Sequence, residues 1–279
     1  MPKAKVRKRK AATRDITVED LPRNRANLFA EIMRNEWKSV LILALIFLAV
    51  IIPFLINRYY YLVNVNEIAA KENPDIHLVY TATFIYLAIE SGVLLVVSFV
   101  EAGVLRIIKR LCYGQGILFG ADFLEGIKEN WKGTLGHFIL FVLLSFLCEY
   151  GAVLLSGNPL MHYLLRVVHF GLILPIFLVA LSVSAIYSDG FFRKLGVSIA
   201  VFLKHLPSLA LASIILFAPL LLLLIPFTYA QIFVPIGFGL LWIAPARLVF
   251  ALLLNRALDK EINEKSMPSI YRKGLRQEL

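Results

Sequence analysis

Six runs of mainly apolar residues, each long enough to cross a lipid bilayer, dominate the sequence. A bilayer core of about 30 Å requires about 20 such residues per helix. The predicted spans are residues 39–62, 78–105, 134–155, 164–187, 206–229 and 231–254. Because 59% of the chain is apolar and only 17% is charged, a water-soluble globular domain is excluded. The sequence therefore predicts an all-α polytopic membrane helix bundle with six transmembrane helices.

The positive charges are distributed unevenly between the two sides of this bundle. The chain has 29 Lys and Arg against 19 Asp and Glu, a formal net charge of +10. The N-terminal arm, the second and fourth connections and the C-terminal tail together hold 25 of these cations, whereas the other three connections, counted with the adjoining ends of their spans, hold three. Since Lys and Arg in short loops stay on the cytoplasmic side, both termini are predicted to be cytoplasmic.

Charge also divides the chain into four parts. Residues 1–15 are rich in Lys and Arg, which predicts a disordered basic cytoplasmic arm. Residues 16–38 place apolar side chains from Leu28 to Trp37 at helical spacing among charged ones, which predicts an amphipathic helix lying in the membrane interface. Residues 39–254 form the six-helix transmembrane domain, and residues 255–279 form a charged cytoplasmic tail.

The basic arm has two interpretations. It can rest on anionic lipid headgroups of the bilayer, where each basic residue contributes about 1 kcal/mol of attraction. Alternatively, its cations serve only to fix the topology of the chain. A nucleic-acid partner is not expected, because the cluster is short and has no interleaved aromatic residues.

Two cytoplasmic connections carry amphipathic segments rich in aromatic residues. Large apolar residues recur every four positions between the second and third spans, and a similar pattern follows Asp189. We expect short amphipathic cytoplasmic helices here. By analogy with helix-in-groove recognition, their apolar residues form a candidate contact surface for another membrane transport subunit. The residues of this surface are Phe123, Ile127, Trp131, Phe191 and Phe192.

Three stretches of sequence carry a family resemblance. Residues 101–110 (EAGVLRIIKR), 121–132 (ADFLEGIKENWK) and 253–260 (LLNRALDK) resemble the YesL-like bacterial membrane proteins, a family described as a domain of unknown function. The likeness extends over roughly residues 27–262 in helix order and loop lengths. It implies a multi-pass protein of the bacterial cytoplasmic membrane, associated with carbohydrate uptake and breakdown systems. Glu101 departs from the small or apolar residue that we expect at its position.

Ionisable residues inside spans are costly, and each one raises a functional hypothesis. At a rise of about 1.5 Å per residue, Glu101 and Arg247 lie about 7 and 12 Å from the inner face of the membrane. An ion pair between them would join the second span to the sixth. The alternative is that each side chain extends separately to the interface.

A second group of polar residues falls in the outer part of the membrane. By the same arithmetic Glu90 and Glu149 lie about 22–24 Å from the inner face, where the fourth span contributes Arg166 and His169. Two carboxylates close together cannot both ionise freely, so this polar cluster could couple to ions or protons or bind a solute rich in hydroxyl groups. The alternative is structural: Glu149 pairs with Arg166 while His169 packs.

The sequence lacks the common signatures of catalysis. We find no HExxH, GxSxG or phosphate-binding glycine loop and no paired-cysteine spacing for a metal, so no cofactor or metal is expected and the chain is not predicted to be an enzyme. The leading hypothesis is a non-enzymatic accessory or assembly factor of a carbohydrate-related transport system. The alternative is a transporter or solute-binding membrane component that uses the outer polar cluster.

Overall fold

The computed structural model describes residues 21–71, 73, 75–224 and 228–276. It is 86% helical, and the described residues contain no strand. Six helices are long and apolar enough to cross a membrane, so the predicted all-α polytopic bundle is confirmed. The predicted basic arm, residues 1–15, lies outside the described residues, as do residues 16–20.

Several of the spans are built from more than one helical segment, because π-helical and 3₁₀ turns interrupt them. In chain order the segments are α1 Arg25–Asn35, α2 Trp37–Ala69, α3 Ile76–Cys112, α4 Phe119–Leu154, α5 Pro159–Val168, η2 His169–Ile173 (π), α6 Leu174–Ile186, α7 Phe191–Lys204, α8 Leu206–Phe217, η3 Ala218–Leu224 (3₁₀), α9 Thr228–Gly237, η4 Phe238–Trp242 (π), α10 Ile243–Leu258, η5 Asp259–Asn263 (π) and α11 Glu264–Ser266.

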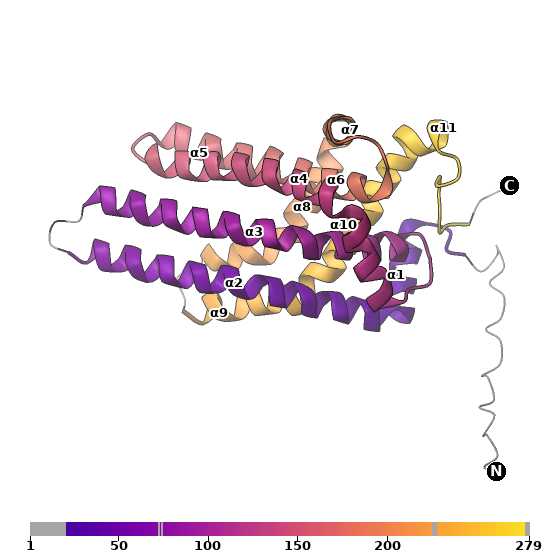
Figure 1. The fold of residues 1–279 in the computed structure, drawn as a ribbon, viewed down its shortest axis with the longest axis horizontal. Helices are drawn as coiled ribbons and strands as arrows, with labels where there is room; N and C mark the ends of the chain where they lie inside the picture. The colour runs from indigo at the N-terminus through magenta and orange to yellow at the C-terminus, as the bar shows by residue number, and fades with distance from the viewer. Residues whose placement is uncertain (1–20, 72, 74, 225–227, 277–279) are drawn as a thin grey trace, which may run out of the picture.

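The first and last described residues lie at the same end of the bundle, as six crossings require (Figure 1). The backbone N–H of Arg276 donates to the carbonyl of Pro22 over 3.0 Å. We call this the termini end; α1, α7 and α11 lie there. The α2–α3 connection and α5 lie at the opposite end, which we call the far end.

Helix α4 begins well before the predicted span, so residues 119–133 are its first part and not a separate short helix. The N–H of the N-cap residue Leu118 donates to Asp122 Oδ2 over 2.7 Å, so a carboxylate of the first helical residues reaches back to the start of the helix. No proline follows to break the helix, so it continues for 36 residues. This exceeds the length that a bilayer needs, and α2 and α3 are similarly long.

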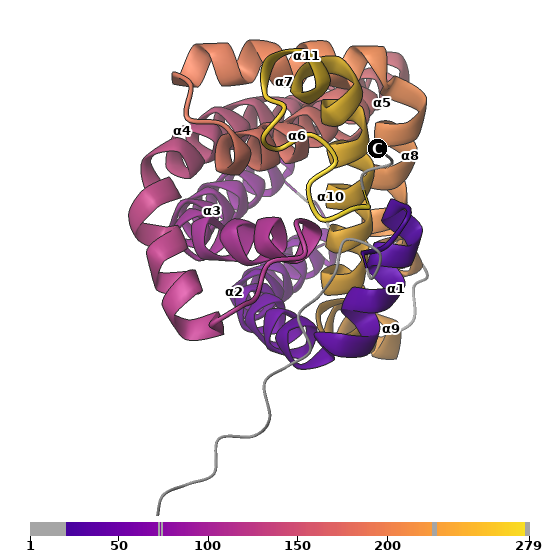
Figure 2. The same ribbon diagram turned by 90° about the vertical axis from the view of Figure 1, so that its right-hand side faces the viewer.

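The apolar core is concentrated toward the termini end. In α3, buried residues are nearly continuous from Glu101 to Leu105 but sparse before Ser98, and α5 has none. One core cluster joins α1, α2, α3 and α10, and another joins α6, α7, α8 and α10. Helix α10 contributes to both, and Figure 2, which looks onto the termini end, shows it well inside the bundle.

Helices α3 and α4 approach closely at two glycines. A Cβ atom on Gly126 would lie 2.7 Å from Arg106 Cβ and 3.0 Å from the Ala102 carbonyl oxygen. On the opposing helix, a Cβ atom on Gly103 would lie 2.6 Å from the ring of Phe123. Only glycine allows the two backbones to approach this closely.

Candidate functional site

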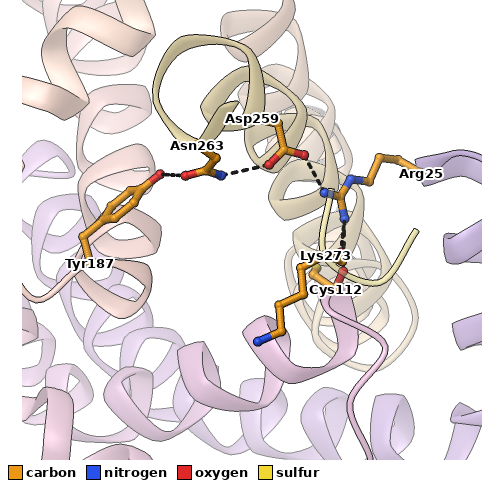
Figure 3. Close-up of polar contacts among 6 residues, drawn as sticks. All are labelled: Arg25, Cys112, Tyr187, Asp259, Asn263 and Lys273. Atoms are coloured by element: carbon orange, nitrogen blue, oxygen red, sulfur yellow. Dashed lines mark hydrogen bonds and ion pairs between the residues drawn. The ribbon is translucent and has the colours of Figure 1, made fainter. Parts of the chain in front are cut away.

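A polar network at the termini end connects five segments that are distant in sequence (Figure 3). Arg25 lies at its centre, in the first turn of α1. Its Nη2 donates to Asp259 Oδ2 over 2.8 Å, and its Nη1 donates to the carbonyl oxygens of Cys112 and Lys273, each over 3.2 Å. One guanidinium group therefore holds α1 to the end of α3, to η5 and to the C-terminal segment.

The network continues from Asp259 to the end of α6. Asn263 Nδ2 donates to Asp259 Oδ1 over 2.8 Å, and the hydroxyl of Tyr187 donates to Asn263 Oδ1 over 2.6 Å. Asp259 and Asn263 are the first and last residues of the π-helical turn η5. All three side chains are buried, so the hydrogen bonds compensate the loss of water.

Tight backbone contacts hold the C-terminal segment against the end of α3. Gly274 has a φ of +82° and lies so close to Tyr113 that an added Cβ atom would sit 2.7 Å from the carbonyl carbon of that residue. The Lys273 Nζ lies 5.6 Å from the centre of the Tyr113 ring. Burial raises the pKa of the Tyr113 phenol, because withdrawal from water disfavours the ionised form.

Sequence reasoning did not find this network. Its members are up to 248 residues apart, and two of the acceptors are backbone carbonyls, which carry no residue signature. The one available signal was the i,i+4 spacing of Asp259 and Asn263 at the end of an apolar helix.

Glu101 and Arg247 come together in an ion pair between α3 and α10. Their side chains are 8% and 10% exposed, so both charges are withdrawn from solvent. Of the two sequence-based interpretations, the geometry is that of the pair and not of two side chains extending separately. The pair lies where the core is densest, among the buried residues of both helices.

The outer polar residues also meet, with Glu149 at the centre. Its Oε2 lies 2.6 Å from Arg166 Nη1, and its Oε1 lies 2.6 Å from His169 Nδ1. Glu90 is on α3, within electrostatic range of Glu149 and His169 but outside this pair of contacts. His169 opens the π-helical turn η2, and its buried Nε2 has no partner among the described residues.

The five residues of the predicted contact surface have different surroundings. Phe123 lies over Gly103. The ring of Trp131 stacks on that of Phe99, with 6.0 Å between the ring centres. Phe191 packs on His137, with 4.7 Å between the ring centres. Ile127 is half-buried. Phe192 is 83% exposed, which makes it the most open of the five. Three of these side chains therefore make part of their contacts within the chain.

An apolar groove of about 750 Å³ runs between α2 and α3. All of its lining residues are apolar: Ile46, Ala49, Val50, Pro53, Ile89, Gly92, Val93, Val96, Val97, Val100 and Phe123. Those on α2 and α3 recur at three- and four-residue spacing, so each helix contributes a single face. A Cβ atom on Gly92 would meet no atom within 4 Å, so the groove is open at that point.

The six spans make this chain an integral membrane protein. Among the described residues, no three His, Cys, Asp or Glu side chains lie close enough together to hold a metal ion. Comparison with known protein families, curated proteins and solved structures finds no match for the chain. The resemblance to the YesL-like family therefore stays a prediction.

Proposed function

We propose that this integral membrane protein is a non-enzymatic accessory or assembly factor that binds another subunit of a carbohydrate-related transport system. The observation that carries the proposal is the apolar groove between α2 and α3, which no helix of the described chain fills. The carbohydrate connection comes from the family resemblance alone.

The groove has the properties of a helix-binding surface within lipid. Association of helices there depends on van der Waals packing, and small residues such as Gly92 and Ala49 allow a close approach. The groove ends at Phe123, which belongs to the contact surface predicted from the sequence. A transmembrane helix of the partner would thus meet one continuous apolar surface from α3 to the start of α4.

The charged residues support a binding role more than a catalytic one. Arg166 and His169 engage both carboxylate oxygens of Glu149, and Arg247 engages Glu101. Each of these carboxylates is paired, so in this proposal the ion pairs hold helices together and the apolar surface selects the partner.

Filling the groove tests the proposal. We expect Gly92→Leu to lower the recovery of transport subunits in affinity purification from native membranes at least fivefold, because its side chain would occupy the open part of the groove. The matched control is Gly237→Leu, another glycine of a span with no atom within 4 Å of an added Cβ. Equal recovery with both variants would show the groove to be ordinary lipid-facing surface and would end the proposal.

The alternative function is transport or solute binding at the outer polar cluster. A specific observation favours it: His169 is buried in a π-helical turn beside Glu149 and keeps a ring nitrogen without a partner among the described residues. Such turns are frequent at functional sites. Solute uptake into liposomes by the purified protein, lost in Glu90→Gln or Glu149→Gln, would replace the accessory role with this one.

We infer that the termini end faces the cytoplasm of a bacterial cell and that the protein lies in the cytoplasmic membrane. The cation distribution supports this orientation, since the termini end carries most of the Lys and Arg. A membrane-impermeant maleimide should label Asn73→Cys, in the α2–α3 connection, from outside the cell. Both native cysteines are buried, so the maleimide should label them little in the unmodified protein. Labelling only after the membrane is opened would reverse the orientation.

A further inference from the structure

A pocket of about 820 Å³ opens at the termini end between α1, α10 and the C-terminal segment. Its volume falls within the range of about 300–1,000 Å³ that is typical of ligand sites. The Arg25–Asp259 pair of Figure 3 forms part of its wall. The polar residues of the wall are Arg23, Asn24, Arg25, Arg256, Asp259, Lys260, Glu264, Tyr271 and Arg272.

The charge of this pocket is strongly positive. Five of the lining residues are Arg or Lys and two are acidic. Arg25 and Asp259 neutralise each other, so four cations remain against Glu264. The side chains of these four cations make no hydrogen bond or ion pair with another described residue; they are Arg23, Arg256, Lys260 and Arg272. The pocket therefore presents unpaired donors that suit a phosphate group.

One of these cations is held in an uncommon backbone conformation. Arg272 has a φ of +49°, and it is the one residue other than glycine with a positive φ among those described. Such conformations cost free energy, and they persist only where the surrounding structure imposes them. The two residues that follow Arg272 are held in place: the Lys273 carbonyl accepts from Arg25, and Gly274 packs closely against Tyr113. These contacts fix the segment so that Arg272 lines the pocket.

The other wall of the pocket changes from apolar to basic along α10 and into the π-helical turn η5, which contains Lys260. Val249, Leu253, Arg256 and Lys260 follow at spacings of four, three and four residues, and all four line the pocket. At about 1.5 Å per residue, Arg256 lies about 4–5 Å and Lys260 about 10 Å beyond Leu253. The interfacial layer of a bilayer is about 5–7 Å thick on each side. With the sixth span ending at residue 254, as the sequence predicts, this wall would pass from acyl chains to headgroups.

We propose that this pocket binds an anionic phospholipid, with its phosphate at Arg256, Lys260 and Arg272 and an acyl chain along Val249 and Leu253. A soluble phosphate would leave the apolar face unused, and a zwitterionic lipid would leave the excess positive charge unbalanced. Basic pockets between membrane helices are known sites for anionic headgroups. None of the lining residues given for this site belongs to the basic arm, and the site does not depend on the proposed accessory function.

Native mass spectrometry of the full chain, titrated with phosphatidylglycerol or phosphatidylcholine in detergent, tests the proposal. We expect phosphatidylglycerol to bind at least tenfold more tightly. Arg256→Gln should weaken its binding about fivefold and Arg256→Gln with Lys260→Gln about 25-fold, because each surface cation contributes about 1 kcal/mol. Both side chains are exposed, so the unliganded melting temperature should not change.

The control is Lys128→Gln with Lys132→Gln, two exposed cations of α4 away from the pocket. It removes the same charge and keeps the basic arm, so non-specific attraction to anionic lipid is matched. Equal binding of the two lipids, or equal losses in the two double variants, would overturn the proposal. Displacement of phosphatidylglycerol by inorganic phosphate or glycerol phosphate would also overturn it, because it would show a soluble anion site.

Discussion

The helices at the termini end are joined across the whole bundle, whereas the polar contacts of the described residues at the far end join pairs of neighbouring helices. At the termini end, Arg25 alone contacts three other segments, and Asn263 adds the end of α6. At the far end, Asn57 Nδ2 donates to the Tyr86 carbonyl between α2 and α3, and Glu149 joins α4 to α5 and η2.

This difference teaches where the arrangement of a membrane bundle is specified. Within lipid there is no hydrophobic driving force between helices, because acyl chains are as apolar as the side chains. Polar contacts near the membrane surface and a dense core beside them then decide which helices are neighbours. The far end, with fewer such constraints, keeps apolar surface that is available to lipid or to another protein.

The largest effect should follow from breaking the buried ion pair at the dense end. Glu101→Gln leaves the guanidinium of Arg247 buried without a counter-charge, which should lower the free energy of unfolding by about 3–5 kcal/mol. Chemical unfolding in detergent micelles measures this. The double variant Glu101→Leu with Arg247→Leu should recover much of the loss, since neither charge remains. A single variant as stable as the wild type would remove the contrast between the two ends.

A smaller effect is expected in the polar network. Asp259→Asn removes the charge that accepts from Arg25, which should cost about 1.5–3 kcal/mol, the range for hydrogen bonds to charged groups. Helix α1 should then exchange its amide hydrogens faster than in the wild type. The control Glu264→Gln alters an exposed acid five residues further along. Unchanged exchange in residues 25–35 would mean that α1 is held by its apolar face alone.

The α3–α4 crossing should be sensitive to a single methyl group. Gly126→Ala places a Cβ atom 2.7 Å from Arg106 Cβ and 3.0 Å from a backbone carbonyl, so the helices must separate. Overpacking of this kind costs about 1–3 kcal/mol. Gly120→Ala lies on the same helix in open space, and it should leave the melting temperature unchanged or slightly raised. Equal melting temperatures would show that the crossing adjusts freely.

The smallest effect belongs to the far end. Glu149→Gln should lower stability by about 1 kcal/mol or less, because Arg166 is 38% exposed and solvent or headgroups can replace its partner. Faster amide exchange confined to α5 and η2 would agree with a local, pairwise contact. A loss as large as that of Glu101→Gln would show that the far end is specified as strongly as the termini end.

The sequence predicted the spans and the Glu101–Arg247 pair for physical reasons. Bilayer thickness sets a minimum length for each span. Helix rise converts sequence position into depth, and this placed the opposite charges of Glu101 and Arg247 at similar depths in the membrane. The same arithmetic placed Glu149, Arg166 and His169 in one layer, where the structure brings them together. It did not give the distance from Glu90 to that group, because depth does not determine which way a side chain points.

The remaining differences come from interactions that a linear pattern does not show. The start of α4 was missed because its charged face was taken for a connection, although helical periodicity continued into the span. The π-helical turns at His169 and Asp259 change the register of a helix by contacts with its neighbours. The pocket between α1, α10 and the C-terminal segment is lined by Arg23 and Arg272, which are far apart in the sequence and meet only in the folded chain.

The 248 residues that separate Arg25 from Lys273 set an order of events during biosynthesis. Helix α1 emerges from the ribosome early, but two of the three groups that accept from Arg25, the Asp259 carboxylate and the Lys273 carbonyl, are translated only after α10. Until then, the Cys112 carbonyl at the end of α3 is the one of these three acceptors that has been translated. Insertion of the spans must therefore precede the formation of these hydrogen bonds. A nascent chain interrupted before residue 259 would enter the membrane without the contacts of Arg25 to Asp259 and Lys273.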